Sequence, residues 1–106
     1  MKYNKLVRDK IPAIIEADGC VPVTRSLGEK EFESELQKKL QEEVTETLNA
    51  ESGKHRLEEL GDVLEVMSAL AAVDGYTVDD IIAAAARKRE KRGGFDKRIF
   101  LIEEKN

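Results

Sequence analysis

Apolar residues recur at helical spacing in four separate stretches of the chain. In the second stretch, from about residue 28 to 52, an apolar residue returns every four positions, at Phe32, Leu36, Leu40, Val44 and Leu48. Shorter stretches of the same kind cover residues 11–19 and about 78–91. This spacing places the apolar side chains on one face of an α-helix. Together with the third stretch, the pattern predicts four helices.

The third stretch, about residues 54–74, is apolar around most of its circumference, at Leu57, Leu60, Val63, Leu64, Val66, Met67, Leu70 and Val73. A helix of this kind is expected to be buried by other helices or by a second subunit. Four helices with short connections and an aliphatic core predict an all-α, four-helix-bundle-like fold. Residues 22–27 and 98–102 carry β-branched and aromatic residues, which allow a short β pairing between the two ends of the chain.

Residues typical of helix ends mark the expected boundaries. Asp9 can cap the first helix. Ser26 and Glu29 have the spacing of a capping box for the second helix, and Gly53 is expected to end it. Thr77 is expected to cap the fourth helix.

Two pairs of carboxylates lie on the predicted second and third helices. Glu43 and Glu46 are three residues apart, as are Glu59 and Asp62, so each pair occupies one helix face. The connection near residue 53 is short, which makes the two helices antiparallel neighbours. Glu46 and Glu59 lie about equally far from this turn, and so do Glu43 and Asp62. The four carboxylates are therefore expected to converge.

Such a cluster is unfavourable unless a cation neutralises it. Mg²⁺ takes oxygen ligands, keeps several waters and typically serves a phosphate-bearing substrate. The alternative is that the glutamates form an ordinary solvated helix surface. A di-iron site is disfavoured, because such sites use Glu-x-x-His on two helices. The single histidine, His55, follows no glutamate at that spacing and is interpreted as turn surface.

Composition narrows the function classes. The length of 106 residues allows one domain, residues 1–106, with a single modest core. The net charge of −4 gives no support for a nucleic-acid binder, and no apolar run reaches the about 18 residues of a membrane span. One cysteine, Cys20, excludes an internal disulfide and suits a reducing environment. We expect a cytoplasmic protein with neither a nucleic-acid polymer nor a membrane as partner.

The acidic segments also resemble a known family. "KLQEEVTE" followed by "EELGDVLEV" is similar to the EExxE…ExxD motif of the all-α nucleoside triphosphate pyrophosphatases, across Lys39 to Val66. This superfamily includes MazG, the dimeric dUTPases, dCTP pyrophosphatase and phosphoribosyl-ATP pyrophosphohydrolase. The ends, "YNKLVRDKIPAIIEADG" and "KRGGFDKRIFL", look like those of small MazG-like, phosphoribosyl-ATP-pyrophosphohydrolase-like proteins. The resemblance thus covers nearly the whole chain.

The resemblance implies Mg²⁺-dependent hydrolysis of a nucleoside triphosphate to the monophosphate and pyrophosphate, with Mn²⁺ as a substitute ion. It implies that Glu43, Glu46, Glu59 and Asp62 bind the metal. Glu42 would stand behind these ligands or orient the attacking water.

Cationic side chains should face the acids, because phosphoryl transfer depends on positioning and charge neutralisation. Lys39, one turn before Glu43, and Arg8 are candidates for binding substrate. The remaining candidates surround the glycine pair at residues 93–94, at Lys88, Arg89, Arg92, Lys97 and Arg98. The alternative for this last group is a solvated basic helix end, which the helix dipole favours.

These observations predict a nucleotide pyrophosphohydrolase that removes noncanonical nucleotides and assembles as a homodimer or a dimer of dimers, a homotetramer. Two alternatives stay open: the phosphoribosyl-ATP pyrophosphatase of histidine biosynthesis, and a catalytically silent helical interaction module. Nothing in the sequence selects a base.

Overall fold

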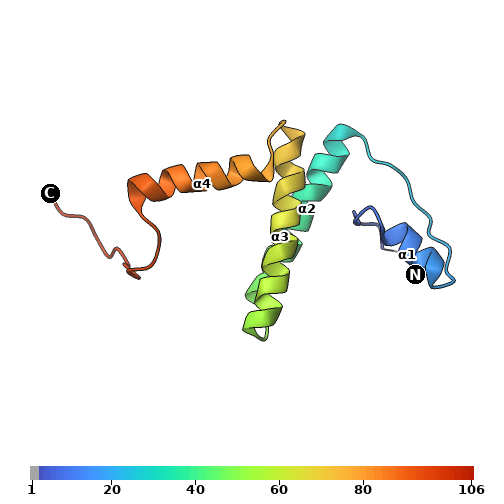
Figure 1. Cartoon of the computed structure of the whole chain (residues 1–106), viewed down its shortest axis with the longest axis horizontal. Helices are drawn as coiled ribbons and strands as arrows, with labels where there is room; N and C mark the ends of the chain where they lie inside the picture. Colours follow the sequence, from blue (N-terminus) through green and yellow to red (C-terminus); the bar gives the residue numbers. More distant parts are fainter. Residues whose placement is uncertain (1–2) are drawn as a thin grey trace.

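The computed structural model describes residues 3–106 and contains four α-helices. They are α1 (Ile11–Ala17), α2 (Glu29–Leu48), α3 (Gly53–Val73) and α4 (Val78–Arg92). Residues 3–106 include no β-strand, so the all-α prediction is confirmed and the predicted β pairing is wrong. The two segments expected to pair lie at opposite ends of the molecule (Figure 1). In addition, the proline at position 22 has no N–H to donate to a sheet.

The antiparallel hairpin of α2 and α3 forms the centre of the molecule (Figure 1). α4 contacts only α3 and then points away from the hairpin, while α1 packs on no other helix. The Cα radius of gyration is 18.3 Å, whereas a compact chain of this length has about 13 Å. The predicted bundle is therefore wrong for a single chain, because only two of the helices pack along their length.

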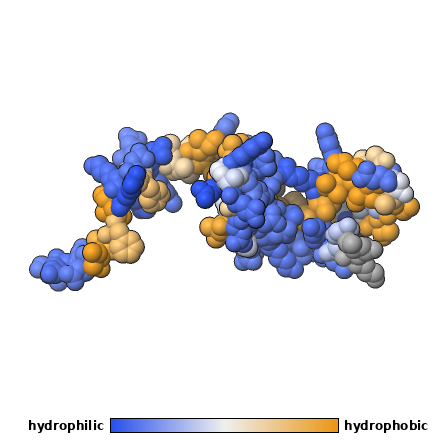
Figure 2. All heavy atoms as spheres, turned by 90° about the horizontal axis from the view of Figure 1, so that it is seen from below, coloured by the Kyte–Doolittle hydropathy of each residue, from blue (hydrophilic) through white to orange (hydrophobic). Residues whose placement is uncertain are grey.

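Few apolar side chains are buried within one chain. Among the described residues, the buried hydrophobic ones are Leu36 and Val66. The other helices of the same chain do not bury α3, since Leu57, Leu60 and Leu64 are 70%, 47% and 46% exposed. Figure 2 shows further apolar surface near the N-terminal end and along α4 and the C-terminal segment. No helix in residues 3–106 combines the length and apolarity that crossing a bilayer requires.

The ends of α4 and α3 follow from local hydrogen bonds. The Thr77 hydroxyl accepts from the Asp80 N–H, and the Asp80 carboxylate accepts from the Thr77 N–H, which makes a complete capping box. The predicted cap at Thr77 is confirmed. Ser52 caps α3 by accepting from the His55 N–H at 3.0 Å. This bond fixes the first turn of the helix that carries Glu59 and Asp62.

Three other predicted boundaries are wrong. Gly28, in extended conformation, precedes α2, so the spacing of Ser26 and Glu29 does not form a capping box. α2 ends four residues earlier than expected, and Gly53 begins α3 instead of ending α2. α1 starts after Lys10 without a side-chain cap, so Asp9 does not fulfil the predicted role. In each case the observed helix boundary lies one to four residues from the residue that was predicted to cap the helix.

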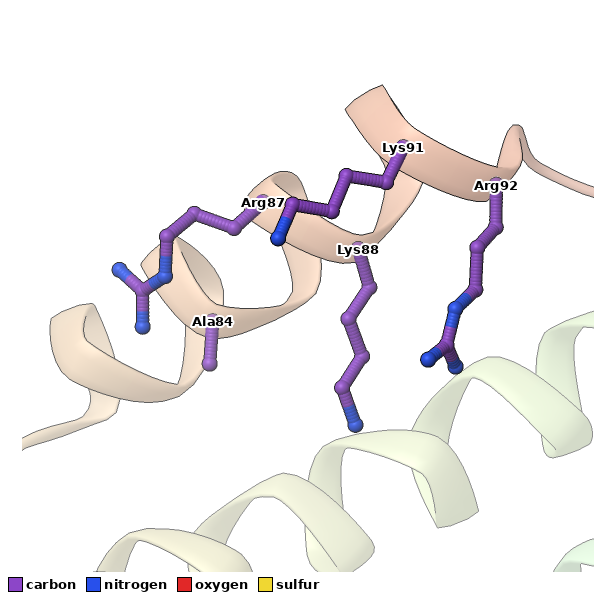
Figure 3. Close-up of a pocket in the computed structure, with 5 residues that line it drawn as sticks. All are labelled: Ala84, Arg87, Lys88, Lys91 and Arg92. Atoms are coloured by element: carbon purple, nitrogen blue, oxygen red, sulfur yellow. The ribbon is translucent and has the colours of Figure 1, made fainter.

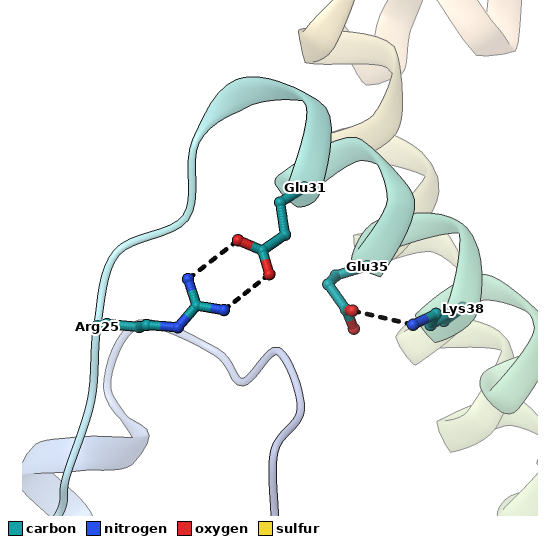
Figure 4. A network of polar contacts seen from close by, with 4 residues as sticks. All are labelled: Arg25, Glu31, Glu35 and Lys38. Atoms are coloured by element: carbon teal, nitrogen blue, oxygen red, sulfur yellow. Dashed lines mark hydrogen bonds and ion pairs between the residues drawn. The ribbon is translucent and has the colours of Figure 1, made fainter.

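One ion pair fastens the connection between α1 and α2 to the hairpin. The Arg25 guanidinium donates two hydrogen bonds to the Glu31 carboxylate, at 2.9 and 2.7 Å (Figure 4). This hydrogen-bonded arginine lowers the pKa of Glu31. Because the pair is exposed to solvent, it orients the connection more than it stabilises the fold.

Candidate functional site

The hairpin brings Glu43 and Glu46 of α2 together with Glu59 of α3. One carboxylate oxygen from each residue lies within 4.8 Å of the others. The three differ in exposure: Glu43 is buried, with 9% of its surface exposed, Glu59 is half-buried and Glu46 is exposed. The cluster therefore has one side buried in the hairpin and one side open to solvent.

Two carboxylate oxygens on the buried side lack partners. Glu43 Oε2 and Glu59 Oε2 are buried, and no described residue donates a hydrogen bond to either. Burial, followed by the charges of Glu46 and Asp62, raises the pKa of Glu43. Hydrogen-bonding proximity to the Glu59 carboxylate, followed by the charge of that group, raises the pKa of Glu46. The protein thus holds more negative charge here than its own groups neutralise.

Asp62, the fourth predicted ligand, stands beside this group and not within it. Its charge reaches Glu43, whose pKa it raises. Its Oδ1 accepts a hydrogen bond of 2.6 Å from Arg8, which comes from the segment before α1. The structure therefore brings three of the four predicted acids into one cluster and ties the fourth to a predicted substrate-binding arginine.

Lys39 lies on the α2 side of the cluster. Its Nζ is 3.5 Å from Glu42 Oε1 and 3.8 Å from Glu43 Oε1. The lysine side chain is only 19% exposed, and its charge opposes the rise in the pKa of Glu43. Glu42, on the solvent side of this pair, is joined to the cluster through Lys39. Within residues 3–106, Lys39 and Arg8 are the lysine and arginine that form ion pairs with the predicted site acids.

The other predicted substrate-binding residues lie away from the acids. Lys88 and Arg92 line a hollow of about 250 Å³ with Arg87 and Lys91, two basic residues that the sequence analysis did not single out (Figure 3). Within residues 3–106, none of the predicted cations of this region forms an ion pair with the acidic cluster, neither Lys88, Arg89, Arg92, Lys97 nor Arg98. α4 carries them away from the hairpin (Figure 1).

His55 is the residue that the sequence analysis missed. It is not turn surface: it lies in the first turn of α3, and its Nε2 is 3.2 Å from Glu59 Oε1. The spacing of four residues between His55 and Glu59 was the available signal, because residues four apart meet on one helix face. The Glu-x-x-His spacing of di-iron sites does not include this arrangement, because His55 precedes Glu59.

The donor set suits a hard divalent cation. Carboxylate oxygens are the ligands that Mg²⁺ and Mn²⁺ prefer, and a small octahedral ion can draw together oxygens from adjacent helices. The two buried oxygens without donors are the part of the cluster that a solvated acidic surface does not explain.

The raised pKa of Glu43 predicts that, without divalent cations, the contribution of this residue to the stability of the wild-type protein falls as the pH rises. A carboxyl with a raised pKa in the folded state stabilises the fold below its unfolded pKa and loses this contribution as pH passes its folded pKa. Glu43→Gln removes this titration. The Tm of the variant minus that of the wild type should be near zero at about pH 4 and positive at about pH 7. Thermal unfolding in EDTA measures the difference, and a pH-independent value would contradict the assignment.

Comparisons with known proteins leave the family of this chain open. No protein-family model and no solved structure matches it. An uncharacterised protein of Mycolicibacterium smegmatis is 44% identical over 59 residues. The match covers 49% of this chain and 60% of that protein, so the chain spans less than two thirds of the relative's length.

Proposed function

We propose that the protein is a Mg²⁺-dependent nucleotide pyrophosphohydrolase of the all-α, MazG-like type. The observation that carries the proposal is the meeting of Glu43, Glu46 and Glu59 within 4.8 Å, with two of their oxygens buried and unpaired. Like charges held this close are costly unless a cation lies between them. The resemblance of Lys39 to Val66 to the EExxE…ExxD motif supports the same assignment.

In this proposal Glu43, Glu46 and Glu59 hold the ion, and Asp62 joins them once Arg8 is drawn to the substrate. Mg²⁺, or Mn²⁺ in its place, supplies phosphate charge neutralisation and a water of lowered pKa. Lys39 holds Glu43 in place and limits the repulsion inside the cluster. Glu42, paired with Lys39 at the solvent edge, orients the attacking water.

Arg8 has a second part in the proposal. In the free protein its guanidinium balances the charge of Asp62 at 2.6 Å. A triphosphate offers the same planar cation a stronger, multiply charged partner. Arg8 would then bind phosphate at the edge of the site, and Asp62 would become free to serve as a ligand.

We further propose that the protein works as a homodimer or a dimer of dimers. α3 exposes Leu57, Leu60 and Leu64, and a second copy of the chain can cover this stripe. Assembly would also complete the bundle that one chain leaves open. The basic end of α4, which lies away from its own acids, would reach phosphate groups in the assembly.

The reaction is tested by measuring pyrophosphate release from a panel of canonical and noncanonical nucleoside triphosphates, with Mg²⁺ and with EDTA. We expect turnover that requires the metal and yields the monophosphate. Hydrolysis of phosphoribosyl-ATP alone would assign the protein to the biosynthetic reaction instead. Absence of turnover, without thermal stabilisation by Mg²⁺ and nucleotide, would favour a silent interaction module.

A further inference from the structure

His55 connects the start of α3 to the acidic cluster. Its Nδ1 accepts a hydrogen bond from the Glu51 backbone N–H at 3.3 Å, and its Nε2 lies 3.2 Å from Glu59 Oε1. Because Nδ1 is an acceptor in this arrangement, the neutral ring carries its proton on Nε2. The imidazole therefore donates to the Glu59 carboxylate, and its backbone partner fixes the ring that does so.

This contact distinguishes the two oxygens of Glu59. Oε1 is occupied by the imidazole, whereas Oε2 is buried and has no donor among the described residues. The Glu59 side chain is only 13% exposed, so it has little room to exchange its two oxygens. The histidine thus fixes one oxygen of a carboxylate that also lies within 4.8 Å of carboxylate oxygens of Glu43 and Glu46.

The neutral donor also differs from the other partners of the acids. Lys39 places a positive charge against Glu43, and Arg8 places one against Asp62. These charges reduce the repulsion among the acids, but they also disfavour the binding of a further cation. A neutral N–H orients Glu59 without placing a positive charge beside it. Neither ring nitrogen is free to coordinate an ion, because one donates and the other accepts.

We propose that His55 is a positioning residue that orients Glu59 Oε2 toward a divalent cation held with Glu43 and Glu46. The proposal rests on the proposed function, because it concerns the same cluster. Hydrogen-bond partners that orient metal ligands change metal affinity by about 10–100-fold when they are removed. His55→Leu should therefore weaken cation binding without preventing folding, since the histidine side chain is 44% exposed.

The test measures Mn²⁺ affinity of the full chain by electron paramagnetic resonance, with Mg²⁺ as competitor. We expect His55→Leu to weaken Mn²⁺ binding by about 10-fold or more. His55→Gln should stay close to the wild type, because its amide N–H can reach the place of Nε2. His55→Asn, which is equally polar but one carbon shorter, should behave like His55→Leu. Rescue by glutamine and not by asparagine identifies the donated hydrogen bond as the cause.

Ser52→Ala is the control for a merely structural role. It removes the cap of the same helical turn and should lower Tm, yet leave Mn²⁺ affinity unchanged. Equal affinity of the wild type and His55→Leu would overturn the positioning role. Equal losses in His55→Leu and His55→Gln would overturn it as well. Failure of the wild type to bind Mn²⁺ would instead overturn the proposed function, so the two failures are distinguishable.

Discussion

Glu43→Gln should reduce pyrophosphate release by about 100-fold or more and leave the protein folded. The loss should exceed the about 10–100-fold effect of removing an outer hydrogen-bond partner, because Glu43 is proposed to contact the ion directly. Of the three clustered carboxylates it is the most buried, and one of its oxygens has no partner among residues 3–106. Steady-state kinetics with the best triphosphate of the panel, at saturating Mg²⁺, measure the effect.

The same substitution should stabilise the fold at neutral pH. Glutamine keeps the shape of the side chain and removes the charge that burial and the neighbouring acids disfavour. A gain on the order of 1 kcal/mol would raise Tm by about 4–8 °C for a domain of this size. Opposite changes in activity and stability are typical of a residue kept for function. Parallel losses of both would mean that Glu43 is a structural residue, and the site assignment would be wrong.

Glu58→Gln is the matched control for this experiment. Glu58 neighbours Glu59 on α3, but it is exposed and lies outside the cluster. The substitution makes the same change in charge and shape at nearly the same place in the chain. Turnover should stay within about twofold of the wild type, because exposed charges are strongly screened. A large loss here would indicate that net charge, and not the cluster, controls the reaction.

The helices could be predicted from the sequence because their signals are local. Apolar spacing of three to four residues located all four, and Thr77 capped α4 as expected. The helix boundaries predicted at Ser26 and Gly53 were wrong, because several residues near each boundary are able to start or end a helix. Which of them does so depends on the path of the connecting chain, as the Arg25–Glu31 pair illustrates.

The acidic cluster was also within reach of sequence reasoning, since a short turn sets the register of two antiparallel helices. Contacts between distant segments were not. Nothing local shows that Arg8 pairs with Asp62, 54 residues away. The position of the basic residues in and after α4 could not be predicted either, because the direction of α4 depends on tertiary packing. The contact of His55 with Glu59 was local and visible in the spacing of four residues.

Replacing Leu60 and Leu64 together with glutamate should convert the protein from an oligomer into a monomer. Both leucines lie on the exposed stripe of α3, at 47% and 46% exposure in a single chain. Burying a leucine side chain completely contributes about 1.5–3 kcal/mol, so partial burial of both in each subunit adds a large share of a dimer's stability. Four glutamates at such an interface add repulsion and desolvation costs. The wild type should have two or four times the chain mass of 11.9 kDa, and the variant that mass itself.

Light scattering coupled to size-exclusion chromatography measures these masses. The control replaces Val21 and Val23 with glutamate, because these residues are 86% and 95% exposed on the segment before α2 and lie outside the α3 stripe. It adds the same charge and should keep the wild-type mass. A monomeric wild type, or an oligomer that survives both substitutions in α3, would show that this stripe is not the interface.

Since one chain buries only Leu36 and Val66 among its described apolar residues, loss of the interface should also lower Tm sharply. Assembly and folding of this protein would then be a single equilibrium, in which the hairpin that carries the acids depends on the second copy for most of its apolar burial.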